Sequence, residues 1–178
     1  MKRVSLAQLG ALALAMAFAA PGWAQQQKSV AVATIVEHPA LDAVRDGIQA
    51  ALKQAGYEAG KNLRWQFQSA QGNTGTAAQI VRKFVGDQPD VIITIATPTS
   101  QAAVAATKSV PVLFSAVTDP VAAKLVPNWE ASGGNVSGVS DLLALDKQMD
   151  LLRQVVPGAK RVGMVYNPGE ANSVVVVK

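Results

Sequence analysis

Cysteine is absent from the 178 residues, and histidine occurs once, at His38. Without cysteine the chain has no disulfide framework, no Cys/His catalytic pair and no thiolate for a metal. The sequence also lacks the G-x-S-x-G turn of serine hydrolases and the GxxxxGK[ST] phosphate-binding loop. Catalysis would have to depend on a carboxylate pair such as Asp119 with Glu170. We therefore expect a protein that is not an enzyme and that holds no metal and no cofactor.

Clusters of basic residues are missing as well. The formal net charge is +4, but two of the 16 basic residues, Lys2 and Arg3, lie at the very start of the chain. The rest are scattered among 12 acidic residues, so no basic patch of the kind that binds nucleic acid is indicated. We expect no nucleic-acid partner.

Long apolar runs are limited to the N-terminus. Lys2 and Arg3 precede an apolar run from Leu9 to Ala20, and small residues stand at Gly22 and Ala24. These three regions are typical of a secretory signal peptide, residues 1–24, that is cleaved after Ala24. An uncleaved anchor is the alternative, but the run is short for a membrane span. Because no cysteine follows the cleavage site to carry a lipid, we expect a free periplasmic protein without a membrane anchor.

Strand and helix patterns alternate along the remaining residues. Short runs rich in β-branched residues predict buried strands, and apolar residues at spacings of three and four predict amphipathic helices. Such alternation is typical of a doubly wound parallel sheet, an α/β fold with helices on both faces. The predicted strands are Val30–Val36, Leu63–Ser69, Val91–Ile95, Pro111–Ser115, Val136–Val139 and Arg161–Tyr166. The predicted helices run from Pro39 to Ala55, around Ala77–Phe84, from Thr97 to Lys108, over Val121–Val126 and from Leu145 to Val156.

The segment from Asp90 to Ala106 contains the clearest binding pattern. The strand Val91–Ile95 is followed at once by Thr97, a good N-cap, and Pro98, which suits the first position of a helix. Free N–H groups of Thr99 and Ser100 would then point outward at the carboxyl end of a strand, where α/β sheets bind ligands and helix N-termini favour anions. An ordinary strand-to-helix turn with a good cap is the alternative.

The end of the chain leaves a predicted strand without neighbours. Arg161–Tyr166 has the pattern of a strand buried on both faces, yet little sequence follows it apart from the apolar run at residues 174–177. This predicts a first lobe over residues 25–141, and a crossover helix with only the start of a second α/β lobe over residues 142–178. The alternative is one complete small domain.

Four loops at predicted strand ends resemble those of one family. Together with the exported leader, they resemble the ABC-transporter substrate-binding proteins that include tryptophan- and tyrosine-binding members. The resemblance runs from Val30 to the last residue and includes residues 134–141, which resemble the family's passage out of the first lobe. The loops are residues 37–42, 96–100, 115–120 and 167–173.

This resemblance implies a type I periplasmic-binding fold, in which two α/β lobes clamp a ligand between them. It implies that the 97–100 loop holds a ligand carboxylate, that Asp119 supplies a polar contact, and that the 167–173 loop meets a ligand ammonium or carboxylate. The family usually has a small apolar residue where Thr99 stands. The predicted ligand-binding residues are Pro39, Ala40, Thr97, Pro98, Thr99, Ser100, Asp119, Asn167, Glu170, Asn172 and Ser173.

Some of these residues also have purely structural interpretations. The resemblance places the His38 loop in the cleft wall, but for His38 itself a solvated position before a proline is favoured over direct contact with the ligand. Asp119 would cap a helix, and Glu170 would suit a first helical turn because the helix dipole favours acids there.

The function that the resemblance implies is binding and transport. The protein would bind a small amino-acid-like solute, with aromatic amino acids as one option, and deliver it to the membrane permease of an ABC transporter. The alternative is the ligand-sensing domain of a receptor or regulator with the same fold. A signal peptide, where a repressor would carry a helix-turn-helix, argues against a cytoplasmic regulator.

Overall fold

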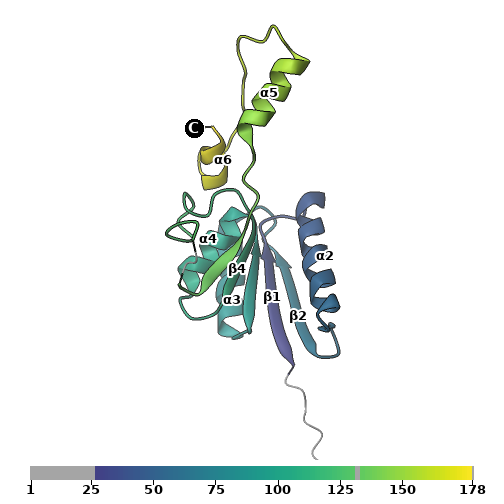
Figure 1. Cartoon of the computed structure of the whole chain (residues 1–178). Coiled ribbons are helices and arrows are strands. Elements are labelled where there is room, and N and C mark those ends of the chain that lie inside the picture. Colours follow the sequence, from purple (N-terminus) through teal and green to yellow (C-terminus); the bar gives the residue numbers. More distant parts are fainter. Residues whose placement is uncertain (1–26, 131–132, 178) are drawn as a thin grey trace, which may run out of the picture.

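A parallel sheet forms the centre of the molecule (Figure 1). The computed structural model describes residues 27–130 and 133–177, so the predicted signal peptide lies outside the described residues. All neighbouring strands of the sheet are parallel, in the order β2-β1-β3-β4-β5. The strands are β1 (Lys28–Thr34), β2 (Leu63–Ser69), β3 (Val91–Ile95), β4 (Val112–Val117) and β5 (Val136–Ser140).

Helices cover both faces of this sheet, which confirms the doubly wound α/β fold. Helix α2 (Pro39–Gln54) packs on one face through residues spaced three and four apart, including Val44 and Ile48. Helices α3 (Thr74–Gly86) and α4 (Thr97–Ala106) pack on the other face, where Phe84 and Ala103 are fully buried. Because alternate residues of a strand point to opposite faces, β1 supplies side chains to both cores.

The chain leaves the sheet after β5. It continues into α5 (Leu145–Val155), which projects beyond the carboxyl ends of the strands, and returns to α6 (Ala171–Val176). Helix α6 lies near the start of α4, and its Ala171 packs against the core on that face. None of the helices in the described residues is long and apolar enough to cross a membrane.

Most predicted elements are confirmed, because their patterns are local. The strands at Leu63–Ser69 and Val91–Ile95 have the predicted bounds, and the other strands of the sheet shift by one or two residues. The apolar spacing that begins at Leu145 does form a helix, α5. Helix α6 was not predicted from the sequence.

The predicted helix at Val121–Val126 is wrong. The segment forms consecutive turns: Ala123 donates to the Asp119 carbonyl, and Leu125 and Val126 both donate to the Pro120 carbonyl. Lys124 has a φ of 59°. A left-handed residue at this position ends helical hydrogen bonding after one turn.

The predicted strand at Arg161–Tyr166 is also wrong. These residues have no regular secondary structure and are exposed. A strand requires a neighbour for its backbone N–H and C=O groups, and no strand of the described chain lies beside this segment.

Candidate functional site

A cavity of about 440 Å³ lies at the carboxyl edge of the sheet. Residues that follow each of the five strands line it, and a segment around α6 closes it from the other side. Strands β1 and β3 are neighbours whose following helices leave to opposite faces, and this is the point at which open α/β sheets bind ligands. The lining residues are Ile35, Val36, His38, Leu41, Gly72, Ala96, Thr97, Pro98, Ala116, Thr118, Asp141, Glu170 and Asn172.

One residue, Ala96, turns β3 into α4. It has φ 80° and ψ 155°, and it occupies the N-cap position that the sequence pattern assigned to Thr97. That prediction is therefore wrong, and Pro98 is the second helical residue rather than the first. This backbone region is essentially restricted to glycine, and another residue there costs on the order of 1–3 kcal/mol. The junction consequently stores backbone strain at the edge of the cavity.

Hydrogen bonds from the first turn of α4 hold the junction in place. The Ala96 carbonyl accepts from the Thr99 hydroxyl at 2.9 Å, from the Ser100 hydroxyl at 2.9 Å and from the Ser100 N–H at 3.2 Å. The Ser100 hydroxyl also lies 2.9 Å from the Thr94 hydroxyl. Both side chains are fully buried, so Thr99 and Ser100 support the site from behind. The expectation that the Ser100 N–H is free is wrong, because it closes a helical turn.

Thr97 differs from these two neighbours. The residue is 2% exposed and lines the cavity, yet its Oγ1 has no hydrogen-bond partner among the described residues. The first turn of α4 leaves the N–H groups of Thr97 and Thr99 without intrahelical acceptors, and Pro98 has no N–H. A buried hydroxyl that lacks a partner costs about 1–3 kcal/mol. The start of α4 thus offers hydrogen bonds to a group that would enter the cavity.

The opposite wall of the cavity carries acceptors. Glu170 stands at the N-cap of α6, where one carboxylate oxygen accepts from the Asn167 side chain at 3.0 Å. The Oδ1 atom of Asn172 is buried without a partner within the described chain. Asp141 adds a second carboxylate at the end of β5. The lining residues all lie in the described part of the chain, and none of them is a lysine or an arginine. Because the two carboxylates have no basic side chain beside them in this lining, this wall favours a cation.

Four of the eleven predicted ligand-binding residues line the cavity: Thr97, Pro98, Glu170 and Asn172. The other seven lie outside its lining. Pro39 and Ala40 begin α2 between the lining residues His38 and Leu41, and Ser173 lies within α6. Asp119 accepts from the N–H groups of Val121 and Ala122, each at 2.9 Å, and so caps a turn. Asn167 bonds within its own loop, and Thr99 and Ser100 lie behind the junction.

Other lining residues were missed from the sequence. Gly72, Ala96, Ala116, Thr118 and Asp141 all stand within three residues of the end of a strand. The position of each strand end was the available signal, and it did mark the loops 96–100 and 115–120. Within those loops Ala96, Ala116 and Thr118 were not chosen as ligand contacts.

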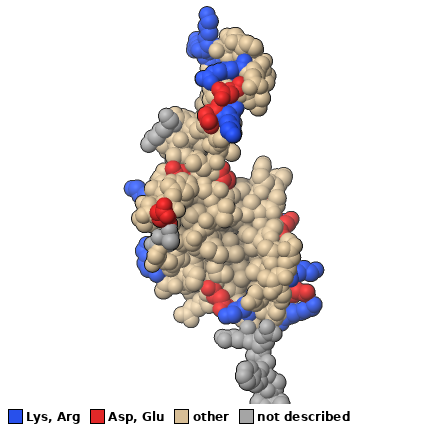
Figure 2. Space-filling view, in the orientation of Figure 1, with Lys and Arg blue, Asp and Glu red and all other residues tan. Residues whose placement is uncertain are grey.

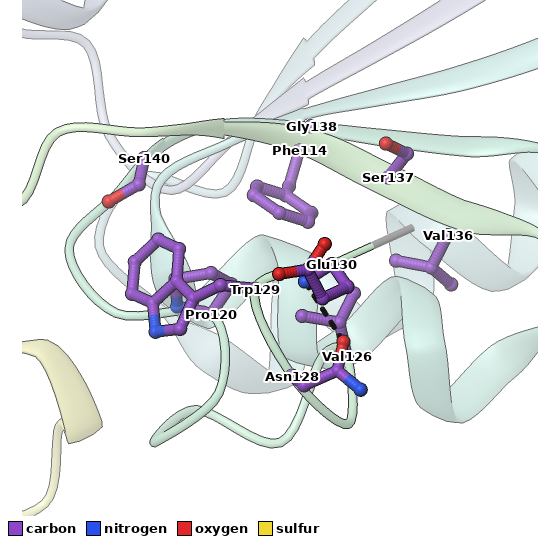
Figure 3. Close-up of a pocket in the computed structure, with 10 residues that line it drawn as sticks. All are labelled: Phe114, Pro120, Val126, Asn128, Trp129, Glu130, Val136, Ser137, Gly138 and Ser140. Atoms are coloured by element: carbon purple, nitrogen blue, oxygen red, sulfur yellow. Dashed lines mark hydrogen bonds between the residues drawn. The ribbon is translucent and has the colours of Figure 1, made fainter. Parts of the chain in front are cut away.

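A second cavity lies away from this edge, between β5 and the loop around residues 126–130 (Figure 3). The Phe114 ring points into it, and Trp129 lies at its rim. Its volume of about 90 Å³ corresponds to only a few water molecules. Across residues 27–130 and 133–177, no three His, Asp or Glu side chains gather closely enough to hold a metal ion.

A parallel α/β sheet with a cavity at its carboxyl edge is typical of a class of protein, the α/β proteins that bind small molecules at that edge. Residues 29–178 match the model of one family, described as ABC transporter substrate binding protein. The chain belongs to this family.

Comparisons with individual proteins agree with this assignment. A tyrosine-binding protein from Clostridioides difficile is 45% identical over 153 residues, which are 86% of this chain and 44% of that protein. A solved protein from Vibrio cholerae is 54% identical with a TM-score of 0.84, over 85% of this chain and 51% of that chain. A Streptococcus structure in complex with L-Trp is 34% identical with a TM-score of 0.82, and the match covers 85% of this chain and 51% of that chain. The chain thus spans about half the length of these relatives.

Proposed function

We propose that this chain is part of an extracytoplasmic solute-binding component of an ABC transporter, which binds a small amino-acid-like solute and delivers it to a membrane permease. The observation that carries the proposal is Thr97, a residue that is 2% exposed, lines the cavity and has a buried Oγ1 atom without a partner in the described chain. Family membership supports the transport role.

The two walls of the cavity match the two charges of an amino acid. The solute's carboxylate would accept from the Thr97 hydroxyl and from N–H groups at the start of α4, where the helix dipole also favours an anion. Its ammonium would donate to Glu170 and to the Oδ1 atom of Asn172. Ile35, Val36 and Leu41 supply apolar surface for the solute side chain.

An aromatic amino acid is the solute that the relatives favour. One relative is named a tyrosine-binding protein, and another was solved with L-Trp. The cavity, at about 440 Å³, falls in the usual range for small-molecule sites. Binding would draw the α6 segment and the sheet edge together by domain closure, without covalent chemistry.

Export is a separate part of the proposal. It rests on the pattern of residues 1–24, and N-terminal sequencing of a periplasmic fraction should begin at Gln25. Recovery of the protein in the cytoplasm with Met1 intact would contradict this part alone.

The zwitterion hypothesis is tested by calorimetric titration with L-Trp, with tryptamine, which lacks the carboxylate, and with indole-3-propionate, which lacks the ammonium. The titrations use the full chain and, in parallel, the chain continued by the second half of the V. cholerae relative. A charge-assisted hydrogen bond contributes about 1.5–3 kcal/mol, so loss of either group should weaken binding at least about tenfold.

Glu170→Gln then assigns the ammonium. This variant should weaken binding of L-Trp and leave indole-3-propionate nearly unchanged, because the lost interactions overlap. Equal affinities of the wild-type protein for L-Trp and both analogues would overturn the proposed function.

A further inference from the structure

Ala96 combines two properties that are rarely found together. Its backbone, at φ 80° and ψ 155°, adopts a conformation that only glycine adopts without strain. Its side chain nevertheless carries a methyl group, and the residue lines the cavity. Glycine would relieve the strain while leaving the backbone path unchanged.

Hydrogen bonds at both its N–H and its carbonyl prevent Ala96 from relaxing. Its N–H continues the sheet by donating to the Ser115 carbonyl at 3.0 Å, and its own carbonyl accepts three hydrogen bonds from Thr99 and Ser100. Those two residues are fully buried, as is Ala103 one turn further on. The junction therefore keeps this geometry whether residue 96 is alanine or glycine.

Ala116 lies within β4, directly after Ser115, the last β4 residue that pairs with β3. It lies in the irregular part of the β4–β5 pairing, has a φ of 51° and also lines the cavity. Two alanines with left-handed backbones thus stand side by side on the cavity wall, since the ladder joins β3 to β4 at this edge. Of the five non-glycine residues with positive φ in the described chain, these two alanines are the ones that line the cavity.

We infer that Ala96 is a specificity-determining residue whose methyl group contacts the bound solute, and that the strain it imposes on the fold is retained for this contact. The inference rests on the proposed function, because it assigns a residue of the same cavity. In this arrangement the methyl group limits the depth of the cavity between Thr97 and Ala116.

The decisive property is that stability and affinity should change in opposite directions. Ala96→Gly removes the strain, so the thermal unfolding midpoint of the full chain should rise by a few degrees. The same change removes one buried methyl contact, so the affinity for L-Trp should fall about three- to fivefold. Both quantities are measured on the full chain and on the chain continued by the second half of the V. cholerae relative.

Gln88→Gly is the matched control. Gln88 has a φ of 49°, is exposed and lies at the opposite end of the sheet. Glycine there should raise the unfolding midpoint without any change in affinity. Hydrogen exchange of the Ser100 amide, which donates to the Ala96 carbonyl, reports whether glycine loosens the junction.

Three results would overturn the inference alone: no rise in midpoint for Ala96→Gly, unchanged affinity for L-Trp, or a loss of affinity accompanied by faster exchange at Ser100. The last result would mean that backbone freedom rather than the methyl group sets the affinity. If the wild-type protein binds no amino acid, the proposed function fails and this inference fails with it.

Discussion

Hydroxyl groups at the start of α4 differ in what they contact, although they stand within four residues. Those of Thr99 and Ser100 donate to backbone carbonyls, whereas that of Thr97 has no partner within the described chain. A hydroxyl that already has its hydrogen bonds adds to stability, and one that lacks them is available to a ligand.

Thr97→Val tests this difference, because valine keeps the shape of threonine and removes only the hydroxyl. The free energy of unfolding should stay unchanged or rise by up to about 1 kcal/mol, since no hydrogen bond is lost. The affinity for L-Trp should fall about tenfold. Thr99→Val is the control and should lower stability by about 1–2 kcal/mol with a smaller effect on binding. Equal destabilisation by the two variants would contradict the assignment of the Thr97 hydroxyl to the ligand.

Asp90 ties β1 to β3 at the amino end of the sheet. Its carboxylate accepts from the Ser29 N–H at 2.7 Å, the Ser29 hydroxyl at 2.8 Å and Lys28 Nζ at 3.0 Å. The backbone hydrogen bond from Ser29, followed by those from the Lys28 and Ser29 side chains, lowers the pKa of Asp90 from 3.8 to about 2. A lowered pKa means that the folded protein favours the ionised carboxylate.

The stability that Asp90 contributes should therefore be present above pH 4 and be lost as the pH falls from about 4 to about 2. Thermal unfolding midpoints of the wild-type protein and of Asp90→Asn, measured across this range, should converge at the acidic end. The pKa values of Glu58 and Asp87 are also lowered, chiefly by side-chain hydrogen bonds from Lys61 and Lys83. These effects are present in the wild-type protein and in Asp90→Asn alike, so the difference between the two unfolding midpoints isolates the contribution of Asp90. A constant difference at every pH would show that Asp90 acts independently of its charge.

At the scale of elements, β5 depends on one glycine. A Cβ atom on Gly138 would overlap the backbone carbonyl oxygen of Phe114 and lie 2.5 Å from two atoms of its ring. Phe114 is itself buried in the core beneath α4. The two strands can therefore pair closely only where residue 138 has no side chain.

Gly138→Ala should lower the free energy of unfolding by about 2–3 kcal/mol or more, because backbone atoms must move to admit the methyl group. Gly47→Ala is the matched control. No heavy atom of the described residues lies within 4 Å of its Cβ position, and it stands inside α2. Alanine there should raise stability by about 0.5–1 kcal/mol. Chemical denaturation measures both changes, and a stable Gly138→Ala protein would contradict the close pairing.

At the scale of the whole molecule, apolar and charged surface are unevenly distributed. Figure 2 shows Lys and Arg together with Asp and Glu on the projecting α5 region, and further charged side chains at one flank and at the opposite end of the sheet. The projecting region also exposes large apolar side chains, with Val165 fully exposed. Exposed patches of this kind favour association. The apolar residues are Leu142, Leu143, Met149, Leu151, Val155, Val156, Val162, Met164, Val165 and Tyr166.

We therefore expect the chain to self-associate as its concentration rises, as measured by sedimentation velocity. Val165→Asp should reduce this association without changing the unfolding of the sheet, because residue 165 contacts neither core. Continuation of the chain by the second half of the V. cholerae relative should remove it by covering the same surface. A monomer at all concentrations for the unaltered chain would contradict this expectation.

The sequence by itself determined the five strands of the sheet, most helices and the parallel direction of the strands, whereas the order of the strands comes from the structure. Apolar periodicity, helix-stop glycines and prolines act over a few residues, so they can be read without knowledge of the fold. The same local information failed at Val121–Val126, where a left-handed Lys124 ends the turn, and at Arg161–Tyr166, where a strand requires a partner that local pattern cannot supply. Local pattern also pointed to the loop after β3, and the family resemblance pointed to the segment 167–173; both contribute residues to the lining of the cavity.

Only the tertiary structure decided which atoms of those loops face the cavity. Thr97, Thr99 and Ser100 have similar side chains, and their different roles follow from the carbonyls that lie near each one after folding. The left-handed backbone of Ala96 is likewise imposed by the sheet on one side and α4 on the other. Hydrogen-bond satisfaction and backbone strain depend on neighbours far apart in the chain, and the parallel sheet brings those neighbours to one edge.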